Sequence, residues 1–151
     1  MRQDGRLEAW VRFLRTHAAI TRQLSAELVA EHGLTINDYE VLLHLSRAPD
    51  RLMRRVDLAE SVLLTPSGIT RLLDGLERQG LVGRAECSSD RRVTYAKLTD
   101  AGYARFQEAR KTHLRGIREL FGGRFDQKEL ETLSALLGRL PGVAADDSSE
   151  C

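Results

Sequence analysis

Hydrophobic residues recur at three- and four-residue steps over most of the chain, which is the pattern of amphipathic helices. Residues 81–98 break this pattern. There Leu81-Val82 and Val93–Leu98 flank a polar turn, as in a β-hairpin. The sequence therefore predicts a mainly α fold with one small hairpin, its helices beginning near residues 6, 35, 54, 66, 99 and 126.

The helix predicted over Pro66–Gln79 has a signal at each end. Thr65 can cap its first turn, Pro66 suits the first helical position, and Gly80 can end it in the left-handed conformation. Its apolar side chains share one face and most of its polar ones the other. The apolar residues are Ile69, Leu72, Leu73 and Leu76, and the polar ones are Ser67, Thr70, Arg71, Asp74 and Arg78. The preceding stretch, Arg54–Val62, is predicted as the first helix of a helix-turn-helix.

The tip of the hairpin carries Asp90, Arg91 and Arg92. A hairpin tip has no core to serve, so folding explains two adjacent arginines poorly. Attraction to phosphate and insertion into a narrow minor groove explain them better, although a solvated charged turn is the alternative. A helix followed by a basic hairpin predicts a recognition helix with a wing, a unit that binds duplex DNA.

The charge distribution agrees with this prediction. The net charge is only +1, but residues 51–97 carry an excess of three positive charges and the rest of the chain sums to −2. A modestly basic module on a slightly acidic body suits a sequence-selective binder better than a general DNA coat.

Four motifs in this order resemble the MarR family of bacterial transcription regulators. They are GLTINDYEVLLHL (33–45), DLAESVLLTPSGITRLLDGLERQGLV (57–82), DRR (90–92) and LTDAG (98–102). The resemblance implies that Arg92 enters the minor groove, that Asp90 holds the wing in shape, and that Ser67, Thr70 and Arg71 meet bases or phosphates. The full set of expected DNA-binding residues is Arg54, Thr65, Pro66, Ser67, Thr70, Arg71, Arg78, Asp90, Arg91 and Arg92.

The expected architecture is a winged helix-turn-helix core flanked by N- and C-terminal dimerisation helices. Residues 34–99 would form the DNA-binding lobe, 6–32 and 100–141 the helical dimerisation region, and 142–151 a loose tail. The outer helices carry more apolar residues than a monomer of this size can easily bury: Trp10, Leu14, Ile117, Leu120, Leu133, Leu137 and Leu140. A two-fold homodimer would bury them and set its recognition helices roughly 34 Å apart, on a pseudo-palindromic operator.

The resemblance also implies a small anionic or phenolic effector, bound between the dimerisation helices and the DNA-binding lobe. Trp10, His17, Tyr39 and Glu40 lie on segments that would line that space. For Trp10, a structural role in the dimer core is the alternative. Proteins that resemble this one most often repress transcription.

Other function classes find little support in the sequence. No catalytic motif and no metal-ligating histidine spacing is present, so neither enzyme activity nor a cofactor is expected. No apolar run of membrane-spanning length occurs, and a cytoplasmic location is expected. Two alternatives stay open: a winged-helix module that binds a protein partner, and a redox-responsive regulator acting through Cys87, whose thiol pKa Arg84, Arg91 and Arg92 could lower.

Overall fold

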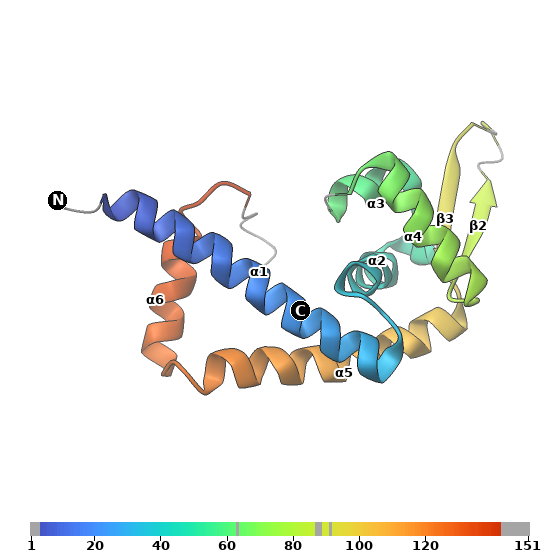
Figure 1. Cartoon of the computed structure of the whole chain (residues 1–151). Coiled ribbons are helices and arrows are strands. Elements are labelled where there is room, and N and C mark those ends of the chain that lie inside the picture. Colours follow the sequence, from blue (N-terminus) through green and yellow to red (C-terminus); the bar gives the residue numbers. More distant parts are fainter. Residues whose placement is uncertain (1–3, 63, 87–88, 91, 143–151) are drawn as a thin grey trace.

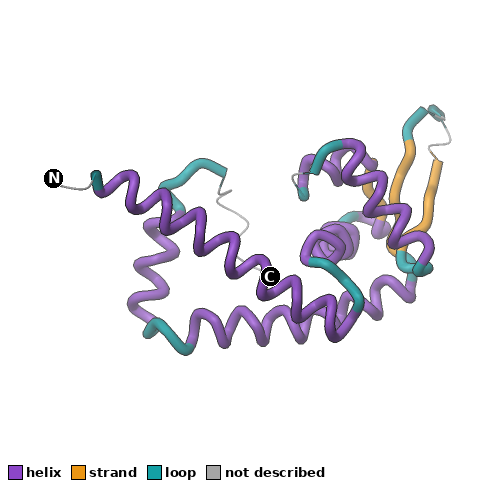
Figure 2. Tube along the Cα trace, viewed as in Figure 1, coloured by secondary structure: helices purple, strands orange, loops and turns teal. Residues whose placement is uncertain are grey.

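Helices form most of this protein, and the strands gather at one end of it (Figures 1 and 2). The computed structural model describes residues 4–62, 64–86, 89–90 and 92–142. Its elements in chain order are α1 (Gly5–His32), α2 (Ile36–Arg47), the 3-10 turn η1 (Pro49–Arg51), β1 (Leu52–Arg54), α3 (Arg55–Ser61), α4 (Pro66–Arg78), β2 (Val82–Glu86), β3 (Thr94–Leu98), α5 (Asp100–Gly122) and α6 (Gln127–Leu137). The predicted mainly α fold with a winged core is confirmed.

Over the described residues the sheet has three strands, and the sequence predicted only two of them. The strand order is β1-β3-β2 with antiparallel pairing throughout, and Arg54 of β1 lies opposite Tyr95 of β3. The helix predicted to begin at Arg54 therefore begins one residue later, because Arg54 belongs to the strand. Three residues are too few to show the alternation of a strand, so only the pairing with β3 defines β1.

Helix ends follow the local chemistry of the sequence. Thr35 and Asp38 form a reciprocal capping box at the start of α2, and Asp126 and Glu129 form another at the start of α6. Gly33 ends α1 at a φ of 68°, a conformation that costs glycine little. The helix starts predicted near residues 35 and 126 are confirmed.

The hydrophobic core lies where α2, α3, α4 and the sheet meet the first half of α5. Its fully buried side chains include Leu28, Leu42, Leu58, Leu73 and Leu76. The second half of α1 packs along α5, whereas the N-terminal half of α1 lies with α6 on the opposite side from the sheet (Figure 1). No helix among the described residues is long and apolar enough to cross a membrane.

Candidate nucleic-acid interface

Helix α4 presents a polar face to solvent and an apolar face to the core. Its first turn is capped by the hydroxyl of Thr65, which accepts a hydrogen bond from the backbone N–H of Gly68 at 3.1 Å. Gly80 adopts a φ of 73° just past the helix, and the N–H of Leu81 then bonds back to the carbonyl of Leu76 at 3.0 Å. Ile69, Leu73 and Leu76 are buried, while Ser67, Thr70, Arg71 and Arg78 are exposed.

The wing places one arginine far into solvent. The carboxylate of Asp90 accepts a hydrogen bond from the backbone N–H of Arg92 at 3.0 Å and lies 3.6 Å from its guanidinium. The side chain of Arg92 is nevertheless 95% exposed. Asp90 thus shapes the backbone of the tip and forms a surface ion pair with the guanidinium, which remains open to solvent. Arg91, Ser88 and Cys87 lie outside the described residues, as do residues 143–151 of the predicted tail.

Arg54 is exposed but already paired. Its guanidinium donates two hydrogen bonds of 2.8 Å to the carboxylate of Asp57, in the first turn of α3. These bonds raise the pKa of Arg54 and lower the pKa of Asp57. A phosphate contact by Arg54 would therefore have to be shared with Asp57.

A link between α4 and the wing was not foreseen from the sequence. Arg84 of β2 donates from Nε to both carboxylate oxygens of Glu77, at 2.9 and 3.1 Å, and from Nη2 to Asp74 at 2.9 Å. The opposite charges of these residues were the available signal, but partners seven and ten positions apart on a helix and a strand follow no simple spacing rule.

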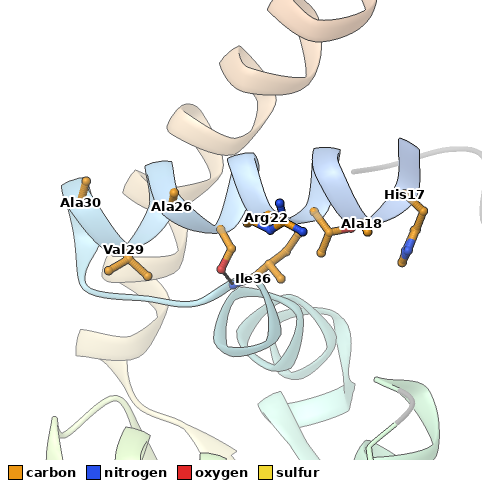
Figure 3. Close-up of a pocket in the computed structure, with 9 residues that line it drawn as sticks. His17, Ala18, Arg22, Ala26, Val29, Ala30 and Ile36 are labelled. Atoms are coloured by element: carbon orange, nitrogen blue, oxygen red, sulfur yellow. Dashed lines mark hydrogen bonds between the residues drawn. The ribbon is translucent and has the colours of Figure 1, made fainter. Parts of the chain in front are cut away.

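The four residues expected to line an effector site lie in different surroundings. His17 lines an open groove of about 780 Å³ between α1 and the start of α2, together with Arg22, Ile36 and small side chains of α1 (Figure 3). Trp10 lies exposed nearer the start of α1, with its ring 6.5 Å from that of Phe13. Neither Trp10 nor the other two candidates are among the residues that line this groove.

Tyr39 is buried in the core, and Glu40 is half-buried beside it. The ring of Tyr39 lies 5.5 Å from that of Phe106 and 4.5 Å from that of His113, both on α5. Burial raises the pKa of Glu40, because removal from water disfavours the charged carboxylate. Burial likewise lowers the pKa of His113, against a smaller opposing effect of the Glu27 charge.

The described surface thus joins an exposed polar helix face to a wing whose arginine extends into solvent. Such an arrangement can offer donors to base edges and a guanidinium to a neighbouring groove. Among the residues that the structure describes, no group of three histidine, cysteine or acidic side chains is placed to hold a metal ion.

Comparison with known proteins agrees with this geometry. A sequence profile of the MarR family matches residues 32–93. The HTH-type transcriptional repressor YetL of Bacillus subtilis (strain 168) is 32% identical over 111 residues, which cover 74% of this chain and 66% of that repressor. These matches extend over the helix-turn-helix that carries the exposed polar face.

Solved structures extend the likeness to nearly the whole chain. AbsC, a MarR family transcriptional regulator from Streptomyces coelicolor, is 31% identical with a TM-score of 0.80, over 91% of this chain and 92% of AbsC. Sco3205 from the same organism, solved in complex with DNA, has the same fold, with a TM-score of 0.82 at 24% identity, over 91% of this chain and 86% of its own. From its motifs, its fold and these relatives, the chain belongs to the MarR family of transcriptional regulators.

Proposed function

We propose that this protein is a homodimeric repressor that binds a pseudo-palindromic operator and releases it in response to a small effector. The observation that carries the proposal is the pairing of two surfaces in one lobe. An exposed polar face of α4 lies beside a wing whose Arg92 is 95% exposed. A module that binds a protein partner through its helix would instead expose an apolar stripe there.

Each part of the interface suits one groove of B-DNA. Ser67, Thr70 and Arg71 supply hydroxyl and guanidinium groups that hydrogen-bond to base edges or phosphates in the major groove. Arg92 suits the narrow minor groove next to it, where the negative potential is strongest in A·T-rich sequence. Thr65 and Arg78 lie exposed at the two ends of α4, and Arg54 lies exposed just before α3; all three suit backbone phosphates.

The apolar surface of α1 and α6 supports a dimer. Trp10 and Leu14 on α1, Leu137 at the end of α6 and Leu140 just after it are all exposed in the single chain. These parts of the chain lie on the opposite side from the sheet (Figure 1). A two-fold partner that covers them would bury this surface and set two copies of α4 about one helical turn of DNA apart, roughly 34 Å.

The groove between α1 and α2 supports the effector. Apolar walls with one cationic side chain, Arg22, and one imidazole, His17, suit a small anion that carries an apolar body. Since α1 belongs to the proposed dimer region and α2 to the DNA-binding lobe, a molecule in this groove would change how the two lobes are held apart. The proposed site of action is the cytoplasm.

Selection of bound duplexes from a random DNA library tests the proposal directly. The expected result is an enriched inverted repeat whose half-sites lie about one turn apart, with an affinity that falls steeply as salt is raised. No enrichment at low salt would refute DNA binding, and enrichment of a single half-site would refute the dimeric operator. Small aromatic acids added to the complex then test the effector, whose binding should release the selected duplex.

A further inference from the structure

Two carboxylates stand on the helix that is proposed to enter the major groove. Asp74 and Glu77 occupy the middle and the last turn of α4. Phosphates repel carboxylates, so each of these charges weakens the attraction between this lobe and DNA. Their presence on this helix therefore points to another task.

Both carboxylates are held by one side chain of the wing. The guanidinium of Arg84 makes three hydrogen bonds of 2.9 to 3.1 Å with them, two to Glu77 and one to Asp74. Glu77 is the better shielded of the two acids, with 24% of its side chain exposed against 43% for Asp74. A guanidinium bound along its edge by two carboxylates is fixed in direction as well as in position.

The contact joins the two elements that must reach DNA together. Arg84 is in the middle of β2, between the turn that ends α4 and the wing tip. The base of the hairpin is fixed separately to the start of α5 by two hydrogen bonds of Thr99. The Thr99 hydroxyl donates to the backbone carbonyl of Gly80 at 2.7 Å, and the backbone N–H of Thr99 donates to the carbonyl of Leu81 at 3.1 Å. Arg84 thus adds a second fixed point to β2, on the side that faces α4.

We propose that Arg84 is a positioning residue for DNA binding. By holding Asp74 and Glu77 it sets the angle between α4 and the wing, so that the polar face of α4 and Arg92 reach adjacent grooves at the same time. This inference rests on the proposed DNA-binding function. In this inference Asp74 and Glu77 orient the wing, and the gain in DNA affinity from that orientation exceeds the loss from their repulsion of phosphate.

The alternative is that Arg84 contacts a DNA phosphate directly. The two roles predict opposite changes in DNA affinity for the substitution Glu77→Gln. If Arg84 bound phosphate itself, Glu77→Gln would free its guanidinium and remove a repulsive charge, and the duplex would bind more tightly. If Arg84 positions the wing, Glu77→Gln loosens the wing and binding weakens although a negative charge has been lost. The sign of the change separates the two roles.

The experiment measures the affinity of the full-length protein for its selected duplex. Glu77→Gln, alone and combined with Asp74→Asn, is expected to weaken binding by about tenfold, the scale of coupling between groups of one ion-pair network. The control is Glu119→Gln, which removes an exposed carboxylate from α5, and it should leave the affinity unchanged. Binding that is unchanged or tighter for Glu77→Gln overturns the positioning role.

A double-mutant cycle gives a readout that general loss of stability would not move. Arg92→Ala should cost less DNA affinity in the Arg84→Ala protein than in the wild type. Without Arg84 the wing is no longer held against α4, so Arg92 contributes less to DNA binding. Equal cost in both backgrounds overturns the proposal. If Arg84→Ala does not fold, the Asp74→Asn, Glu77→Gln protein serves as the second background. Failure of the wild type to bind any duplex would instead overturn the proposed function, and the positioning role with it.

Discussion

Gly102, in the first turn of α5, lies directly against the backbone carbonyl of Leu81, the residue just before β2. A Cβ at this position would overlap that carbonyl oxygen and would come within 2.7 Å of Leu98 Cδ1. The same carbonyl accepts the N–H of Thr99 at 3.1 Å. The start of α5 is therefore packed against the base of the wing, with no room for a side chain between them.

We expect Gly102→Ala to destabilise the protein by about 1–3 kcal/mol, the usual cost of overpacking a tight site. The better helix propensity of alanine, worth about 1 kcal/mol, offsets part of this cost. Gly122→Ala is the matched control in the same helix, because nothing lies within 4 Å of its Cβ position. Chemical denaturation measures both variants, and equal stability would show that the contact with Leu81 relaxes freely.

Arg92→Ala should weaken binding to the selected duplex by about 1–3 kcal/mol without changing the unfolding temperature. The side chain is 95% exposed, so its loss removes little from the folded state. Titration of labelled duplex gives the affinity, and a thermal melt gives the stability. Arg92→Lys keeps the charge without the planar guanidinium, so it shows how much of the effect is simple phosphate attraction. An unchanged affinity for Arg92→Ala would remove this residue from the interface.

The features that could be predicted from the sequence are those fixed by neighbours along the chain. Thr65 and Gly80 mark the ends of α4 because a cap and a left-handed stop are local chemistry. The strand β1 could not be predicted, since it exists through pairing with β3 about 43 residues further along the chain.

The contacts between different helices and strands could not be predicted from the sequence either. Arg84 meets two acids of α4 only because the chain reverses at Gly80. The ring of Tyr39, a residue expected near a ligand, packs 4.5 Å from that of His113, which is far away in sequence. Both contacts depend on how α2, α4, α5 and the sheet assemble, and no spacing rule carries that information.

His113 should make the protein less stable in mild acid. Its ring is buried against Tyr39, and among the described residues Nδ1 has no hydrogen-bond partner. Burial lowers the pKa of His113 in the folded state below its ordinary value of about 6.5. Below the ordinary pKa the unfolded chain binds the proton more readily than the folded protein does. The stability that comes from a neutral, buried His113 is therefore fully present above the ordinary pKa, and it is lost as the pH falls from there through the folded pKa.

The measurement is the free energy of unfolding near pH 7.5 and near pH 5.5. We expect the wild type to lose more stability over this interval than His113→Phe, in which the ring can no longer take up a proton. Other titrating groups are the same in both proteins and cancel in the comparison. An identical loss of stability in both proteins would show that protonation of His113 does not destabilise the folded state.

Leu14→Glu should convert the proposed dimer into monomers. Leu14 is 49% exposed on α1, and a carboxylate there would be buried without a partner when a second copy covers this face. Because each half of the operator would then be bound separately, the affinity for the full inverted repeat should fall by about 10²–10⁴, whereas a single half-site should be bound as before. Val56→Gln is the matched control, since Val56 is also exposed but lies on α3, away from α1 and α6. Light scattering gives the mass of each variant, and a Leu14→Glu protein that keeps the mass of a dimer would place the interface elsewhere.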